Sequence, residues 1–139
     1  MIEPTEEDWV YMAGFLDGEG CFTVTNPRSC TAHIMVYNTY KPVIEWCYEK
    51  FGGRLLRPRL PRKENHRTVY GWQITGKDAV IFIEKIAPYL KEKMRQAAII
   101  LAIENTKNQK RLGRKVHPNF MDERVRLIQT LKDMKHESH

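Results

Sequence analysis

The first pattern along the chain is that of a one-sided helix. Four apolar residues stand at the spacing of a single helix face: Trp9, Met12, Ala13 and Leu16. Thr5 precedes three consecutive acids, which is typical of an N-cap hydroxyl followed by carboxylates at the positive end of the helix dipole. Gly18 and Gly20 interrupt the pattern, so we expect the helix to end there.

Alternating apolar and polar residues then predict two β-hairpins separated by a helix. In the first hairpin the residues expected to face a core are Phe22, Val24, Ala32, Ile34 and Val36. The second hairpin should join strands 54–60 and 67–75 through the polar loop 61–66. A helix is expected between the hairpins at 41–51, with the inward residues Val43, Trp46, Cys47 and Phe51.

The rest of the chain reads as three helices and a basic loop. Helices are expected at 77–86, 91–105 and 119–135, with Val125, Ile128 and Leu131 inward on the last one. Lysines and arginines gather around a glycine in 106–118, which reads as a loop. The order predicts an α+β fold of αββαββα type, with a four-stranded antiparallel sheet and helices on one face. We expect 1–106 to form the core and 107–139 to pack on the same single domain.

Composition narrows the class of partner. The chain has 139 residues and a formal net charge of +6, which favours a polyanionic partner without proving one. Its three cysteines have no paired spacing and no signal sequence is recognisable, so we expect an intracellular protein. An organelle (chloroplast or mitochondrion) and a prokaryotic cytoplasm fit equally well. The longest apolar run, 97–103, is far short of the roughly 20 residues that span a bilayer, so no membrane association is expected.

Two unfavourable placements occur within nine residues of the first helix. Ala13 and Gly14 put small side chains together, where glycine costs about 1 kcal/mol relative to alanine. Asp17 and Glu19 lie at the negative end of the helix dipole, where each acid is disfavoured by roughly 0.3–1 kcal/mol. Solvated acids before a glycine turn would be the simplest interpretation. The combination nevertheless indicates a functional site.

The whole nonapeptide, Met12–Ala13–Gly14–Phe15–Leu16–Asp17–Gly18–Glu19–Gly20, resembles the LAGLIDADG signature of homing endonucleases in its variant LAGFxDGEG. Met12 replaces the leading leucine. The order of elements, Asn38 at the end of the second strand and Lys93 before a long helix also match the single-motif homodimers of that family. The resemblance covers roughly residues 8–105.

The resemblance implies a homodimer in which the motif helices of two chains pack through Ala13 and Gly14. It implies that Glu19 is the catalytic acid and, with the Gly18 carbonyl, a ligand of Mg²⁺ or Mn²⁺. Two such carboxylates at about 5 Å would repel by roughly 3 kcal/mol at an effective dielectric near 20, which a hard divalent cation relieves.

The same resemblance gives roles to three further residues. Lys93 would stabilise charge at the phosphate, Asn38 would hold the solvent network, and Asp17 would be structural. Without the resemblance, Lys93 would be an ordinary exposed lysine and Asn38 a helix-start residue.

The outward faces of both hairpins are the predicted DNA-binding surface. Arg57 and Arg59 are two apart on a strand, so they should point the same way and suit guanine in the major groove. The other candidate contacts are Thr25, Arg28, His33, Arg67 and Gln73. A dimer of this kind fits a pseudo-palindromic site of about 20 base pairs. A strand made soluble by its charges is the alternative interpretation.

These observations predict a site-specific endonuclease that cuts double-stranded DNA with a divalent metal. The alternative within the same fold is a non-catalytic nucleic-acid-binding protein such as an intron maturase. A small basic RNA-binding protein is a second alternative, disfavoured because only Tyr37 offers an obvious stacking ring. The target sequence and the host element, whether intron, intein or free-standing gene, stay open.

Overall fold

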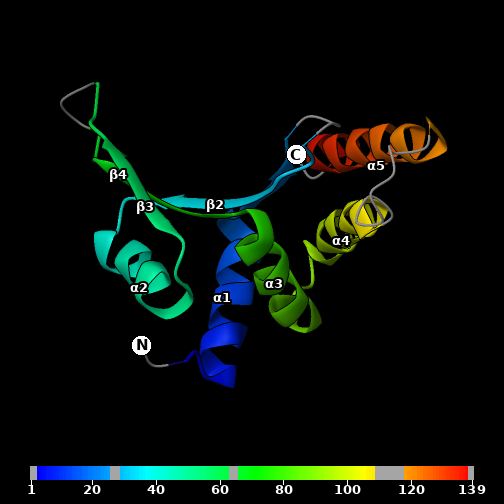
Figure 1. Cartoon of the computed structure of the whole chain (residues 1–139). Coiled ribbons are helices and arrows are strands. Elements are labelled where there is room, and N and C mark those ends of the chain that lie inside the picture. The colour runs from blue at the N-terminus through cyan, green and yellow to red at the C-terminus, as the bar shows by residue number, and fades with distance from the viewer. Residues whose placement is uncertain (1–2, 26–28, 63–65, 109–117, 138–139) are drawn as a thin grey trace.

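The sheet predicted from the alternating segments is present. The computed structural model describes residues 3–25, 29–62, 66–108 and 118–137. Its strands are β1 (Cys21–Val24), β2 (Ala32–Asn38), β3 (Arg54–Arg59) and β4 (Val69–Thr75), which pair antiparallel in the order β1-β2-β4-β3 (Figure 1). The α+β fold class and its four-stranded antiparallel sheet are therefore confirmed.

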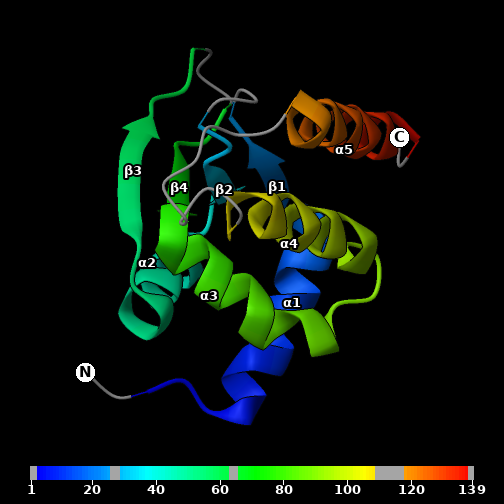
Figure 2. The ribbon, with the colours of Figure 1, turned by 45° about the vertical axis from the view of Figure 1, so that its right-hand side comes forward.

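Helices cover one face of this sheet. α1 (Glu6–Glu19), α2 (Lys41–Phe51) and α3 (Gly76–Ile86) lie beneath it, and a short 3₁₀ turn, η1 (Ala87–Tyr89), leads to α4 (Met94–Asn108). α5 (Pro118–Glu137) lies against α4 beyond the β1 edge (Figures 1 and 2). Over β2, β3 and β4 the opposite face carries no helix of the described residues. We call this the open face of the sheet.

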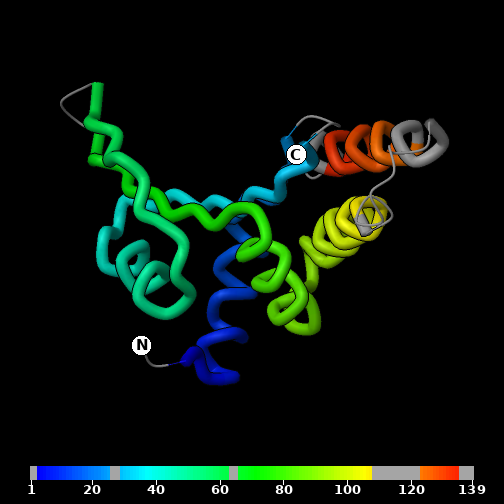
Figure 3. The backbone as a smooth tube through the Cα atoms, viewed as in Figure 1, coloured from blue at the N-terminus to red at the C-terminus, as the bar shows by residue number. Residues whose placement is uncertain are grey.

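The core lies between the sheet and the helices. Alternation along the strands turns every second side chain toward the core. Of the residues expected there in the first hairpin, Phe22, Ala32, Ile34 and Val36 are buried and Val24 is half-buried, and Trp72 and Ile74 of β4 are buried beside them. From α1, Met12, Ala13 and Leu16 are each fully buried against them. The backbone tube in Figure 3 shows that α1 runs up to the strands, so its last residues lie at the sheet.

Both ends of α1 are fixed by local chemistry. Thr5 Oγ1 accepts from the Asp8 backbone N–H at 3.2 Å, and Asp8 Oδ2 accepts from the Thr5 N–H at 2.9 Å. The backbone bond to Thr5 and the ammonium of Lys50 lower the pKa of Asp8. At the other end Gly20 packs so closely that a Cβ there would lie 2.7 Å from Leu16 Cδ2. Glycine at this position therefore lets the chain turn sharply from α1 into β1.

Three expectations about the helices were wrong in detail. α4 begins at Met94 and not at residue 91, because the backbone before it is bound to α1. In α2 the fully buried residues are Ile44 and Cys47, while Val43 and Trp46 are only half-buried. In α5 Ile128 and Leu131 are buried as expected, but Val125 is 49% exposed and Arg124 only 1% exposed. The guanidinium of Arg124 donates to Thr106 Oγ1 of α4 at 2.6 Å.

Two cysteines are part of the packing. Cys30 and Cys47 are buried, and Cys21 is exposed. Burial raises the pKa of the Cys47 thiol to about 12, and burial likewise raises the pKa of Cys30. Both buried thiols are therefore protonated near neutral pH and unreactive. No helix of the described residues is long and apolar enough to cross a bilayer.

Candidate active site at the end of α1

The carboxylate of Asp17 holds the segment that precedes α4. Asp17 Oδ2 accepts from the Lys91 backbone N–H at 2.9 Å, and Asp17 Oδ1 accepts from the Lys93 N–H at 3.0 Å. Both oxygens are therefore engaged with the chain 74 and 76 residues further on. This geometry agrees with the structural role expected for Asp17 and fixes where Lys93 lies.

Lys93 reaches back to the same residue. Its Nζ donates to the Asp17 backbone carbonyl at 3.0 Å, at the negative end of the α1 dipole. α1 has no basic residue of its own in its last turn. The ammonium of Lys93 thus supplies, from a distant part of the chain, the positive charge that this helix end lacks.

Glu19 is the last residue of α1 and is exposed. Its Oε2 accepts from Asn38 Nδ2 at 2.9 Å, and Asn38 Oδ1 accepts from the Tyr40 backbone N–H at 2.7 Å. Asn38 is therefore oriented by the turn after β2 and holds one carboxylate oxygen of Glu19. An acid, an amide and an ammonium, the three groups named from the sequence as catalytic candidates, gather at one helix end.

This site has the donor chemistry of a hard divalent cation. Glu19 leaves Oε1 without a hydrogen bond among the described contacts, and a Cβ added at Gly18 would meet nothing within 4 Å. Carboxylate and carbonyl oxygens are the ligands that Mg²⁺ and Mn²⁺ prefer. Within the described residues no group of three His, Cys, Asp or Glu side chains comes together to hold a metal. One chain thus brings a single carboxylate to this point.

The outer face of α1 differs from the expected dimer contact. Ala13 is fully buried within its own chain, so the expectation that it lies in an interface was wrong. Residue 13 shares the inward stripe of Met12 and Leu16, whereas Gly14 lies 100° further round the helix and is exposed. Val10 and Tyr11, next to Gly14 on this face, are 53% and 57% exposed. Val10, Tyr11 and Gly14 therefore form an exposed apolar patch on α1, with open space at Gly14 and the charged Glu7 on the same face.

The open face of the sheet carries a layered contact that the sequence did not reveal. The ring of Tyr37 covers Gly71, its cross-strand partner, where any Cβ would lie within 2.7 Å of the ring. The guanidinium of Arg59 lies 4.6 Å from the centre of that ring, and its Nη2 donates to Tyr37 Oη at 3.4 Å. Arg59 is exposed but held in one place. Any side chain at position 71 would force the ring of Tyr37 to shift.

Arg57 does not share this face. Leu56 pairs with Gly71 and Arg59 with Val69, so Arg57 and Pro58 together stand opposite Tyr70. This extra residue breaks the alternation that predicted a common direction for Arg57 and Arg59. Tyr70 alternates with its neighbours toward the helix side, where Lys41 lies 5.7 Å over its ring. The expectation that the two arginines point the same way was wrong.

Two other candidate DNA contacts, Thr25 and Arg67, lie just outside the strands. Thr25 closes the first hairpin, because its Oγ1 accepts from the Thr31 N–H at 2.8 Å and bonds Ser29 Oγ. Arg67 lies before β4, which begins at Val69, and is exposed there. Arg28 lies outside the described residues.

His33 and Gln73 form part of a chain of hydrogen bonds on the open face. His33 Nδ1 lies 2.9 Å from Gln73 Nε2, and Arg54 Nη2 donates to Gln73 Oε1 at 3.3 Å. Gln73 is thus 7% exposed although it faces away from the core. Sequence reasoning missed Arg54, whose position opposite Gln73 depends on the register of the second hairpin.

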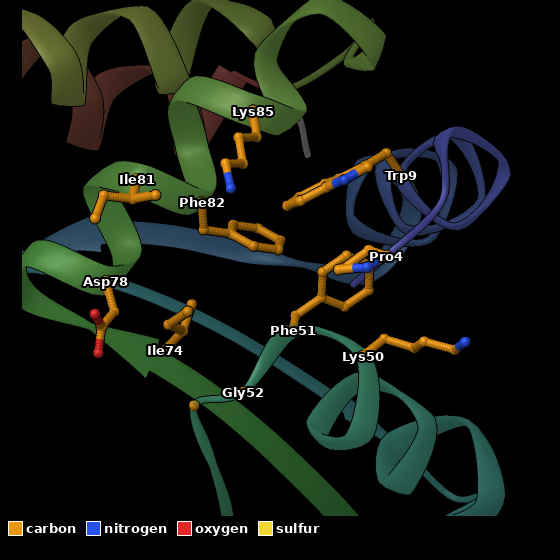
Figure 4. Close-up of a pocket in the computed structure, with 11 residues that line it drawn as sticks. Pro4, Trp9, Lys50, Phe51, Gly52, Ile74, Asp78, Ile81, Phe82 and Lys85 are labelled. Atoms are coloured by element: carbon orange, nitrogen blue, oxygen red, sulfur yellow. The ribbon is translucent and has the colours of Figure 1, made fainter. Parts of the chain in front are cut away.

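A cavity of about 330 Å³ lies elsewhere, on the helix side of the sheet. Trp9, Phe51 and Phe82 form its aromatic wall, with Lys50 and Lys85 at its rim (Figure 4). Trp9 is ten residues, or roughly 15 Å along the helix, from Glu19. The cavity is therefore separate from the group of polar residues at the end of α1.

The fold is that of known enzymes. No family model matches this sequence, and no curated protein sequence matches it. Among solved structures, the homing endonuclease I-CvuI in complex with DNA has a TM-score of 0.71 at 20% identity, covering 93% of this chain and 82% of its own. The archaeal intron-encoded homing endonuclease I-Vdi141I, complexed with DNA, has a TM-score of 0.69 at 23% identity, covering 93% and 86%.

The homing endonuclease I-TnaI covers 94% of this chain and 97% of its own, with a TM-score of 0.61 at 19% identity. Two LAGLIDADG endonucleases, I-AabMI and I-SmaMI, have TM-scores of 0.60 and 0.62. The chain thus has the LAGLIDADG homing-endonuclease fold, as the resemblance of the nonapeptide predicted. This likeness extends far beyond the nine residues of the motif.

Proposed function

We propose that this protein is a site-specific endonuclease that cuts double-stranded DNA with a divalent cation. The observation that carries the proposal is the convergence of Glu19, Asn38 and Lys93 at the end of α1, on the fold of homing endonucleases. The solved structures of I-CvuI and I-Vdi141I are complexes with DNA. The net charge of +6 and the open sheet face support the same kind of partner.

Glu19 and the Gly18 carbonyl would hold Mg²⁺ or Mn²⁺. When bound, such a cation supplies positive charge next to the phosphate and makes bound water more acidic. Asn38 keeps one oxygen of Glu19 in place and leaves the other for the cation. Lys93 places an ammonium at the same helix end, where charge developing on the phosphate needs stabilisation.

We further propose that two chains act together as a homodimer. One chain brings one carboxylate to the site, whereas cutting both strands of a duplex requires two sets of these groups. The exposed apolar patch of α1, formed by Val10, Tyr11 and Gly14, is suited to pack against its symmetry mate. Tyr11 also stacks edge-on against Trp46 at 5.1 Å, which extends this apolar surface toward α2. The two Glu19 side chains would then meet near the two-fold axis.

The decisive experiment is cleavage of a plasmid that carries the uninterrupted insertion region of the protein's own gene. Supercoiled plasmid should become linear with Mg²⁺, and it should stay intact in EDTA or without the insertion region. Sequence-specific binding without cutting in either Mg²⁺ or Mn²⁺ would instead indicate a non-catalytic protein such as a maturase. An absence of sequence-specific DNA binding would refute the proposal as a whole.

A further inference from the structure

The open face of the sheet holds a line of three side chains whose hydrogen-bond directions are fixed by chemistry. Arg54 of β3, Gln73 of β4 and His33 of β2 lie on this face, since Arg54 pairs with Gln73 and the two strands β2 and β4 are neighbours. The contacts are Arg54 Nη2 to Gln73 Oε1 at 3.3 Å and Gln73 Nε2 to His33 Nδ1 at 2.9 Å. Gln73, the middle residue, is nearly buried.

Arg54 determines which way the amide of Gln73 is turned. A guanidinium has five N–H donors and no acceptor, so the amide atom that faces it must be the oxygen. The NH₂ group of Gln73 consequently faces His33. With its only acceptor engaged by Arg54, Gln73 has only N–H groups left to offer to the imidazole.

Gln73 in turn determines the tautomer of His33. An NH₂ group donates, so the ring nitrogen that it contacts, Nδ1, must present its lone pair. In a neutral imidazole the proton then resides on Nε2, on the other side of the ring. His33 is half-buried between Thr23 and Thr75, its cross-strand neighbours, neither of which carries a charge. The sheet therefore presents an N–H donor at this point.

We propose that Arg54 and Gln73 fix His33 as the Nε2–H tautomer, and that His33 thereby reads a hydrogen-bond acceptor on a base in the major groove. Guanine, adenine and thymine offer acceptors there, whereas cytosine offers its N4 amino group, a donor. The target should therefore exclude cytosine at one position of each half-site. This inference rests on the proposed function for its DNA partner, but the tautomer itself is a property of the free protein.

The first test uses the free protein and needs no DNA. In ¹⁵N-histidine-labelled protein at pH 8, two-bond ¹H–¹⁵N correlation spectra should show His33 protonated on Nε2 alone. Arg54→Ala frees the Gln73 amide to turn, so both tautomers should appear. Gln73→Glu offers only acceptors, so the proton should be found on Nδ1. A wild-type His33 protonated on Nδ1, or an Arg54→Ala spectrum unchanged from wild type, would overturn the proposed control of the His33 tautomer by Arg54 and Gln73.

The second test is binding-site selection from a randomised DNA library. The wild type should select against cytosine by about tenfold at one position per half-site. Gln73→Met should remove that selection, while Arg57→Ala, which lies opposite Tyr70 and not on this face, should leave it in place. A strong selected site that accepts cytosine at every position would refute the reading by His33 and leave the proposed function standing. A library with no selected site at all would refute the proposed function, whatever the tautomer.

Discussion

Asp17 and Lys93 are joined by two hydrogen bonds that run in opposite directions between backbone and side chain. The Asp17 carboxylate accepts the Lys93 backbone N–H at 3.0 Å, and the Lys93 ammonium donates to the Asp17 carbonyl, also at 3.0 Å. The second carboxylate oxygen accepts the N–H of Lys91. Because Asp17 fixes the backbone of Lys93, the position of the ammonium at the end of α1 depends on an acid that has no free oxygen for metal.

Asp17→Ala and Lys93→Met should therefore both weaken cleavage but differ in their effect on the stability of the fold. Asp17→Ala leaves two backbone N–H groups without their acceptor, so the free energy of unfolding should fall by about 1–3 kcal/mol and cleavage should weaken with it. Lys93→Met keeps both backbone bonds, so urea unfolding should change little while cleavage is lost. If Asp17→Ala were as stable as the wild type yet inactive, Asp17 would have to act in the chemistry itself.

Glu19→Gln tests the carboxylate directly. The amide oxygen of glutamine can still accept from Asn38 Nδ2, so the fold and the affinity for DNA should persist while cleavage is lost. The matched control is Glu45→Gln on the exposed surface of α2, which should cut normally. Plasmid cleavage and gel-shift titration on the same preparations separate the two properties. Full cutting by Glu19→Gln would place the active site elsewhere.

The dimer can be tested at Gly14 because two adjacent positions of α1 have opposite surroundings. Gly14→Leu adds a side chain where a single chain has open space, so it should leave the monomer folded and push two helices apart. Ala13→Leu, by contrast, adds volume inside the core and should lower the thermal midpoint. Sedimentation should show a dimer for the wild type and for Gly14→Ala, and monomers for Gly14→Leu. A stable Gly14→Leu dimer would exclude this face of α1 as the interface.

Much of the fold could be predicted from the sequence because the spacing of apolar residues and the residues that begin or end each element indicated the same helices and strands. Phe22, Ile34 and Val36 alternate with polar residues in one hairpin, and Thr5 begins a helix with its own capping box. The candidate site was predicted for another reason. The nonapeptide resembles a known signature, and that resemblance, rather than any periodicity, pointed to Lys93 some 74 residues beyond Glu19.

What could not be predicted depends on contacts between distant segments. The extra residue at Arg57–Pro58 can be recognised only from the pairing of β3 with β4. It determines which arginine lies on the open face. Arg124 is buried because Thr106 offers it a hydroxyl, so a hydrophobic pattern could not place it inside. Ala13 looked like an interface residue because its small size suits a close helix contact. In the folded chain Ala13 is instead buried in the hydrophobic core.

The cap of α1 gives a pH-dependent prediction. The pKa of Asp8 in the folded protein is lowered below its ordinary value of 3.8 by its bond to the Thr5 backbone and by Lys50. A carboxyl with a lowered pKa adds stability that is fully present above the unfolded value and is lost as the pH falls through the folded one. Asp8→Asn should therefore lower the urea midpoint at pH 7 and differ less from the wild type below pH 3.8.

Thr5→Ala is the companion change, because it removes the hydroxyl acceptor of the same capping box. It should lower the free energy of unfolding by about 1 kcal/mol at pH 7. If Asp8→Asn lowered the urea midpoint equally at pH 7 and below pH 3.8, the charge of the carboxylate would not contribute to the cap.

Arg59 should read bases, and Lys110 should not. Arg59 is held against Tyr37 on the open face, so Arg59→Ala should cost roughly 1–3 kcal/mol of specific binding and relax one position of each half-site. Tyr37→Phe keeps the ring and should preserve the preference. Lys110, in the basic stretch outside the described residues, is expected to contact only phosphate. Its loss should weaken all sequences alike and flatten the log–log salt dependence by about 0.9 per phosphate contact in each subunit.

Arg57→Ala completes this comparison, since the two arginines carry the same charge on the same strand. The register turns Arg57 toward the face of Tyr70, so its replacement should leave the selected sequence unchanged and alter only the overall affinity. Binding-site selection and salt titration on the four variants distinguish a base contact from a general charge effect. A shift of base preference in Arg57→Ala but not in Arg59→Ala would mean that the bound protein pairs β3 with β4 in a different register.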